Sequence, residues 1–132
     1  MTIQASNAVV KHLPETLSLK EQRQFFAEVE SHFNIDRPCI VLDCSKVRQM
    51  DRSAIHFLLC CLEEAMKRNG DVKLAAIPAQ SRALLQATGA DRLFEVFDTS
   101  AEAVTSFRQL SIGAEVNAYM AGSLQREPES AT

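Results

Sequence analysis

The chain has 132 residues, of which 46% are hydrophobic, and its formal net charge is −3 at pH 7. This length suffices for one domain with one core but not for two ordinary domains, and the hydrophobic content argues against wholesale disorder. The negative balance disfavours a general nucleic-acid binder, which normally carries a basic patch or stripe.

The first third of the chain predicts a strand, a helix and a second strand. Residues 8–10 are short and apolar, which favours a strand end or a piece of a hairpin. Ser18 and Glu21 have the spacing of a capping box, so a helix is expected after them, and it should end before Pro38. One buried face of this helix is expected to carry Phe26, Val29 and Phe33. The apolar run Cys39–Asp43 is typical of a central strand that is covered on both faces.

The middle of the chain predicts a long helix from about Ser53 to Asn69, with Gly70 ending it in a left-handed turn. Apolar residues recur at helical spacing at Ile55, Leu58, Leu59, Leu62 and Met66. Residues 71–77 then predict a strand.

The last third predicts a short helix over 81–88 with Leu84 and Leu85 inward, closed by Gly89, and an alternating strand over 93–97. A second capping box at 99–102 opens a final helix. Its apolar positions are Ala103, Val104, Phe107 and Leu110.

This alternation predicts an α/β fold with a mixed, mostly parallel sheet of four to five strands and about four helices. We expect one domain over residues 1–112. Residues 113–132 are expected to form a tail that is partly helical or disordered.

Several classes of function lack a sequence signal. The cysteines form no C-x-x-C pair, and the three histidines lack metal-ligand spacing. There is no Walker A segment, no G-x-G-x-x-G, no secretory signal and no apolar run near the roughly 18 residues of a membrane span. We therefore expect a cytoplasmic protein that is not an enzyme, binds no metal, cofactor or nucleic acid, and does not insert into membranes. The paired carboxylates Asp43 and Asp51 keep an enzyme as a weaker alternative.

The most informative segment is the polar connection Met50–Ala54 between the central strand and the long helix. It places an acid, a guanidinium and a hydroxyl at a helix N-terminus, where backbone N–H groups are unpaired and negative charge is favoured. A phosphate, a carboxylate or a partner loop could bind there. The alternative is plain helix capping by Asp51 and Ser53, and both interpretations can hold together.

An ordered series of motifs carries a resemblance to a known family. The segments Val41–Val47 and Met50–Ile55 resemble the STAS domain of bacterial anti-sigma factor antagonists, in which an apolar strand ends in Asp-Leu-Ser-x-Val and a second Asp precedes Ser-Ser-Gly or Ser-Thr-Gly. Further likeness continues through 69–74, 84–89, 91–97 and 100–104, so that it covers roughly residues 8–110.

The resemblance implies the STAS fold and a binding protein that acts in transcription regulation in bacteria. In the antagonists of this family, an anti-sigma kinase phosphorylates the Ser or Thr that follows the second Asp, and phosphorylation releases the kinase. Here Arg52 occupies that position and Ala54 replaces the usual glycine, whereas Asp51 and Ser53 match. Arg52 has a fixed positive charge, so it neither mimics a phosphoserine nor accepts a phosphate.

We therefore expect a regulator that binds a protein partner, an anti-sigma factor or ATPase-type protein, without the usual phospho-switch. A homodimer is compatible with the sequence. The expected partner-binding residues are Asp51, Arg52, Ser53, Ala54, Ile55, His56 and Phe57. Ile55 or Phe57 would be the apolar anchors, and Ser53 remains a weaker phosphorylation candidate. Asp43 and Ser45 would support the loop, with a local turn role for Asp43 equally open. The alternative function is a constitutive STAS subunit of a lipid-trafficking ABC transporter that docks on its ATPase.

Overall fold

The computed structural model describes residues 8–108. The tail expected at 113–132, and Leu110 of the final helix, lie outside the described residues. The elements in chain order are β1 (Val9–His12), α1 (Leu19–Phe33), β2 (Cys39–Asp43), α2 (Arg52–Met66), β3 (Asp71–Ala75), α3 (Ala79–Thr88), the 3-10 helix η2 (Ala90–Arg92), β4 (Val96–Phe97) and a last helix that begins at residue 100.

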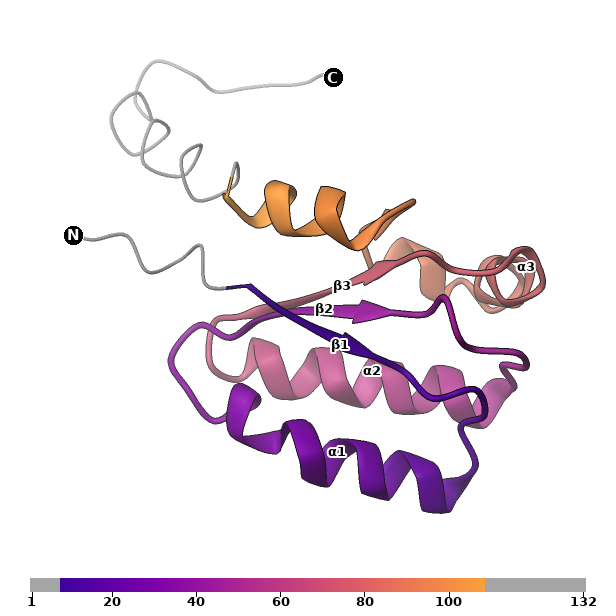
Figure 1. The fold of residues 1–132 in the computed structure, drawn as a ribbon, viewed down its shortest axis with the longest axis horizontal. Coiled ribbons are helices and arrows are strands. Elements are labelled where there is room, and N and C mark those ends of the chain that lie inside the picture. Colours follow the sequence, from indigo (N-terminus) through magenta and orange to yellow (C-terminus); the bar gives the residue numbers. More distant parts are fainter. Residues whose placement is uncertain (1–7, 109–132) are drawn as a thin grey trace.

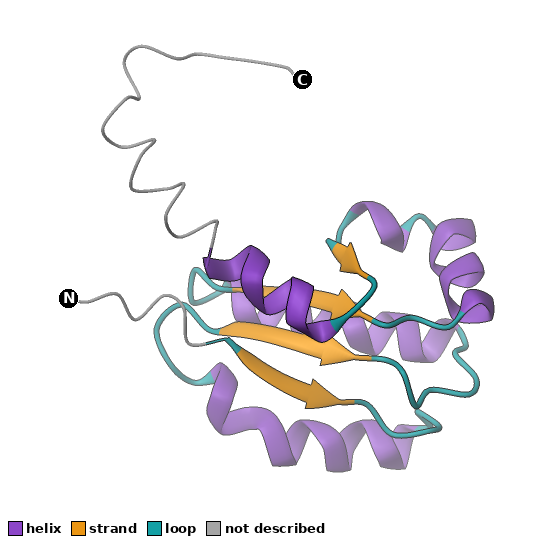
Figure 2. Cartoon of the chain, turned by 45° about the horizontal axis from the view of Figure 1, so that its top comes forward, coloured by secondary structure: helices purple, strands orange, loops and turns teal. Residues whose placement is uncertain are grey.

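The four described strands form one parallel sheet in the order β1-β2-β3-β4. Helices α1 and α2 cover one face of this sheet, and the helix at 100–108 lies on the other face (Figures 1 and 2). The predicted α/β fold class is confirmed, with the described sheet parallel throughout.

The main core fills the space between the sheet and α1 to α3. Fully buried strand residues such as Ile40, Leu42 and Leu74 meet Phe33 and Leu58 of the helices there. Because β2 and β3 are also covered on their other face, they carry the continuous apolar runs that such strands require.

Helix α1 begins as predicted, with Ser18 and Glu21 in a reciprocal capping box. Its buried stripe differs from the prediction. Phe25 is buried, with its ring edge-on to Phe57 at 6.1 Å, while Phe26 is only partly buried. Of two adjacent phenylalanines, the hydrophobic pattern therefore selected the wrong one as the core residue.

Gly70 has a different role from the one predicted. Helix α2 ends at Met66, and the left-handed residue beyond it is Asn69, with φ 64°. A Cβ atom on Gly70 would collide with the backbone oxygen of Pro38. Glycine is thus required because the chain before β2 passes too close for a side chain. Gly89, by contrast, ends α3 with φ 80°, as predicted.

The strand predicted at 93–97 is wrong in its first half. Residues 90–92 form η2, Leu93 is 60% exposed, and only Val96 and Phe97 pair with β3. In α3, Leu85 is fully buried and Leu84 partly buried.

A smaller cluster holds the helix at 100–108 against the opposite face of the sheet. Val41 and Ala75 of the sheet meet Ala103 and Phe107 of the helix, all of them buried. Lys73 is fully buried beside them. Its Nζ lies 2.9 Å from a carboxylate oxygen of Glu95, donates to Ser106 Oγ at 2.7 Å and stands 4.3 Å from the ring centre of Phe107. Polar bonds thus supplement this small apolar contact.

Candidate functional site

The polar segment that the sequence singled out lies at the edge of the sheet where the strands end. Because all strands run the same way, α1, α2 and α3 all begin at this edge, and α3 lies beyond the arrowheads in Figure 1. Open parallel sheets place ligands at this edge. The parallel topology therefore brings three separate polar connections together.

Two of the predicted residues at the start of α2 are engaged within the domain. Asp51 is the N-cap, and its Oδ1 accepts from the N–H of Ala54 at 2.8 Å. Ser53 Oγ accepts from Nε2 of Gln22 at 3.0 Å, and the same nitrogen donates to the carbonyl of Leu17 at 2.9 Å. Ser53 thus joins α2 to α1 instead of capping its own helix.

Arg52 is exposed, and nothing in the described range 8–108 forms a hydrogen bond or ion pair with its side chain. His56 follows one turn later and is also exposed; its Nε2 lies 3.6 Å from Sγ of Cys60. Residues four apart share one face of a helix, so Arg52 and His56 present a donor-rich stripe to solvent.

The three apolar residues predicted for partner contact lie in the core. Ala54 is 1%, Ile55 4% and Phe57 8% exposed. Ile55 and Phe57 as surface anchors are therefore a wrong prediction, and the physical reason is the width of the apolar face of α2. This helix packs against both the sheet and α1, so nearly all its apolar residues are covered.

Sequence reasoning missed the contribution of α1 to this surface. A hollow of about 380 Å³ is lined mainly by α1, with the apolar side chains of Leu19 and Phe26 and the charged ones of Arg23 and Glu30, and Phe57 of α2 borders it. Leu19, the first residue of α1, is 62% exposed. An exposed leucine beside a half-buried phenylalanine was the available signal, because neither belongs to the stripe at 22, 25, 29 and 33.

Asp43 joins the sheet to the last helix at the same edge. Its carboxylate accepts from the N–H of Ser45 at 2.9 Å and from Oγ of Ser100 at 2.6 Å, and it lies 3.6 Å from Nε2 of His12. Burial alone would raise the pKa of Asp43, but the hydrogen bonds from Ser100 and Ser45, aided by His12, lower it overall. Asp43 is therefore a structural carboxylate, in line with its local turn role.

The buried thiols of Cys44 and Cys61 are unreactive. Burial raises the pKa of Cys44 and of Cys61 to about 12, so both stay protonated at neutral pH. In the described part of the chain, no three His, Cys, Asp or Glu side chains come together as a metal site.

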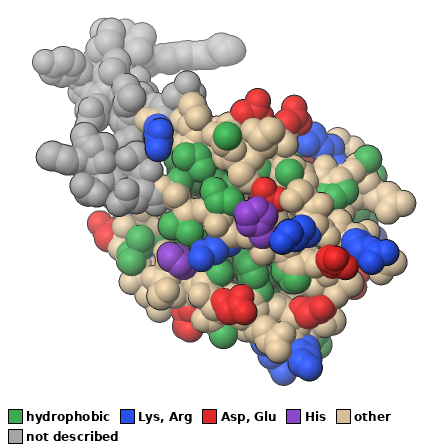
Figure 3. Space-filling model, in the orientation of Figure 1, with side chains coloured by type: hydrophobic (Ala, Val, Ile, Leu, Met, Phe, Trp, Pro, Cys, Tyr) green, Lys and Arg blue, Asp and Glu red, His purple; other side chains and the backbone are tan. Residues whose placement is uncertain are grey.

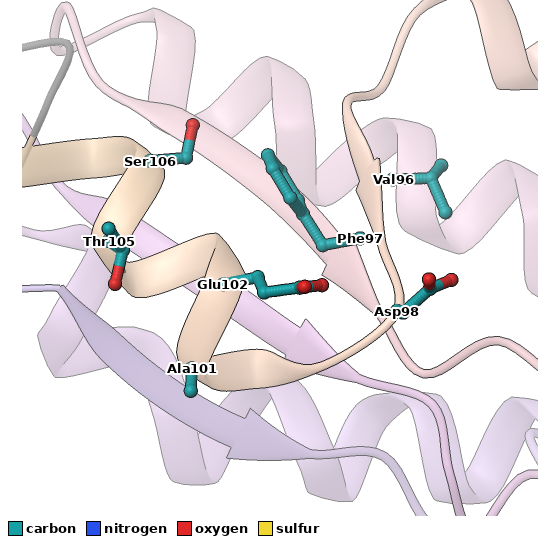
Figure 4. Close-up of a pocket in the computed structure, with 7 residues that line it drawn as sticks. All are labelled: Val96, Phe97, Asp98, Ala101, Glu102, Thr105 and Ser106. Carbon is teal, nitrogen blue, oxygen red and sulfur yellow. The ribbon is translucent and has the colours of Figure 1, made fainter.

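A further hollow lies beside the last helix, where no residue of α2 lines it. Figure 4 shows Glu102 reaching from that helix toward β4, near Asp98 and Phe97, in a cavity of about 580 Å³. Acidic and basic side chains are interspersed over the face shown in Figure 3, so that no single-sign field covers it.

Comparison with known proteins identifies the family. The sequence pattern of the STAS domain matches residues 1–103. An anti-sigma-factor antagonist (STAS) domain protein from Planctomyces limnophilus has a similar structure, with a TM-score of 0.69 at 18% identity over 78% of this chain and 92% of that chain. A candidate anti-sigma factor antagonist from Thermotoga maritima reaches 0.68 at 22% identity over 76% and 87%.

A transporter domain has the same fold. The STAS domain of a SulP transporter from Vibrio cholerae has a TM-score of 0.59 at 19% identity over 84% of both chains. No curated protein sequence matches the chain. Over residues 8–108, no helix has the length and apolar character needed to cross a bilayer. The match of the family pattern over most of its length shows that this chain belongs to the STAS domain family.

Proposed function

We propose that this chain is a non-enzymatic cytoplasmic regulator that binds an anti-sigma factor through the surface around the start of α2. The observation that carries the proposal is Arg52. Its charged side chain is exposed and no described residue pairs with it, whereas Asp51 and Ser53 are already bonded within the domain.

The docking surface comprises Arg52 and His56 of α2 together with Leu19, Arg23 and Phe26 of α1. Its α1 part supplies the apolar area, because Leu19 is exposed and Phe26 borders a hollow. Its α2 part supplies the positive charge of Arg52 and the imidazole ring of His56. We infer that the partner presents an acidic group toward Arg52 and an apolar side chain toward the hollow, since interfaces combine a buried anchor with charge complementarity at the rim.

Regulation in this proposal does not run through phosphorylation at residue 52, because a guanidinium cannot take a phosphate ester. Phosphorylation at Ser53 would first have to break its bond with Gln22, which joins α1 to α2. We therefore propose that binding is controlled by the amounts of the chain and its partner.

A second candidate function is a permanent subunit of an ABC transporter that docks on the ATPase. The same Arg52 favours it, since a permanent contact needs no switch, and a transporter STAS domain shares the fold. The identity of the bound partner separates the two candidates.

The test is affinity purification of the full chain from its native cell, followed by calorimetry with the purified partner. We expect an anti-sigma factor to be recovered, and Arg52→Glu to weaken its affinity at least tenfold, because a like charge would then face the acidic group. Recovery of a transporter ATPase would select the second candidate.

Arg92→Glu is the matched control, because Arg92 is also exposed, has no side-chain partner in the described region, and lies in η2, outside the proposed docking surface. It should bind like the wild type. Equal affinities of the wild type and Arg52→Glu for the recovered partner would refute the proposed surface.

A further inference from the structure

A polar cavity separate from the α1–α2 hollow lies where three helices begin. Its volume is about 430 Å³, and it is lined by Thr16–Ser18 before α1, by Gln49–Asp51 before α2, and by Gln80 and Ser81 in the first turn of α3. Helix N-termini carry unpaired N–H groups and a partial positive charge. The cavity therefore faces three sets of such groups.

Two of these helix starts contain their own acceptors. At α1, the side chain of Ser18 accepts from the N–H of Glu21, and the carboxylate of Glu21 bonds back to Ser18. At α2, the carboxylate of Asp51 accepts from the N–H of Ala54. Both starts thus have a carboxylate that complements the helix end.

Helix α3 has no such complement. Its N-cap is Pro78, whose side chain has no acceptor, and its first turn contains no acid. No bond from a described residue reaches the N–H groups of Gln80 and Ser81. The donors of this helix end therefore remain available to a ligand.

Ser81 gives an independent indication of a ligand. It is only 3% exposed, it lines the cavity, and its hydroxyl has no hydrogen-bond partner among residues 8–108. Buried hydroxyl groups are ordinarily paired, because leaving one unpaired costs its lost hydration. An acceptor in the cavity would satisfy this hydroxyl and the N–H groups of the same turn together.

We propose that this cavity binds a small molecule through a single carboxylate or phosphate group held at the start of α3. The hydroxyl of Ser81 and the N–H groups of Gln80 and Ser81 donate to that group. The cavity exceeds the volume of one such group, so the remainder of the ligand lies toward Gln49 and Asp51. Asp51 would repel a second anion, and a hydroxyl or amine of the ligand therefore faces it. This site does not depend on partner binding at Arg52.

The test is an NMR titration of the ¹⁵N-labelled full chain with acetate and, separately, inorganic phosphate, against chloride at matched ionic strength. We expect saturable shifts of the Gln80 and Ser81 amide signals that exceed those at the starts of α1 and α2. Saturation by acetate alone or by phosphate alone identifies the group, and either result supports the site. Shifts that chloride reproduces, or that neither anion saturates, would overturn it.

Variants distinguish specific anion binding at the start of α3 from a general effect of ionic strength. Ser81→Ala should weaken binding at least threefold, whereas Gln86→Ala, an exposed change on the same helix, should not alter it. Pro78→Asp supplies an internal carboxylate cap and should abolish the shifts while raising the melting temperature. Less than a threefold loss in Ser81→Ala, or undiminished binding in Pro78→Asp, would show that the start of α3 is not the ligand site.

Discussion

The buried Lys73 predicts that the two halves of one ion pair respond very differently to mutation. Lys73→Met should leave the free energy of unfolding within about 1 kcal/mol of the wild type, whereas Glu95→Gln should lower it by about 2 kcal/mol. The side chain of Lys73 is 1% exposed and that of Glu95 is 60% exposed. The asymmetry of burial is the basis of the prediction.

The magnitudes follow from which charge remains buried. Lys73→Met removes the desolvated ammonium, keeps an unbranched apolar side chain against Phe107, and returns Glu95 to water. Glu95→Gln leaves the ammonium buried with the neutral Ser106 hydroxyl as its hydrogen-bond partner, and the charge of Asp71, which forms no ion pair in the described region, still favours it. Breaking a fully buried pair costs about 3 to 5 kcal/mol, and the solvent around Glu95 reduces this to about 2 kcal/mol.

Urea denaturation monitored by circular dichroism measures both variants. The pair Lys67–Glu64, at 3.0 Å with the lysine side chain 69% exposed, is the matched surface control. Lys67→Met and Glu64→Gln should each change the free energy by less than about 0.5 kcal/mol. A larger loss in Lys73→Met than in Glu95→Gln would refute the reasoning.

Three further predictions concern single positions. Asp51→Ala removes the N-cap of α2 and should lower the free energy of unfolding by about 1 kcal/mol in urea, with an unchanged value contradicting the capping role. Gly70→Ala should lower it by at least about 2 kcal/mol, because the new methyl group would collide with the backbone of Pro38; a melting temperature equal to that of the wild type would disprove the close approach. The pKa of Asp43 is lowered in the folded state, so its contribution to stability is full above the ordinary carboxyl pKa and is lost as the pH falls through the lower folded value. Asp43→Asn should therefore flatten the acid side of the stability–pH curve, measured by urea denaturation across pH, and an unaltered acid side would show that the carboxylate is not stabilising.

The sequence predicted those features of the fold that depend on local chemistry. The capping box at Ser18 and the left-handed end at Gly89 each follow from short-range hydrogen bonds and backbone preferences. Gly70 was placed correctly beside the end of α2 but for the wrong reason, because the approach of Pro38 comes from a segment more than thirty residues earlier. Contacts between residues so far apart in the chain leave no periodic pattern in the sequence.

The candidate site also combines features that local sequence predicts with features that depend on long-range packing. The sequence located the polar start of α2, and local capping by Asp51 was one of its two interpretations. The bond from Gln22 to Ser53 and the exposure of Leu19 depend on how α1 lies against α2, which the pattern of either helix alone does not determine. Burial of Ile55 and Phe57 has the same origin, since the broad apolar face of α2 meets both the sheet and α1.

Arg52 gives a final prediction that separates stability from binding. It is the first residue of α2, where the helix dipole disfavours a cation, and the first turn contains no acid. Arg52→Gln should therefore raise the free energy of unfolding of the isolated chain by about 0.3 kcal/mol in urea denaturation, because it removes the cation without placing a second carboxylate beside the N-cap Asp51. If that gain is measured, Arg52 lowers stability where it stands and has no described partner there, which is typical of a position kept for binding. If Arg52→Gln instead destabilised the isolated chain, Arg52 would have a structural role, and the proposed docking surface would lose its main support.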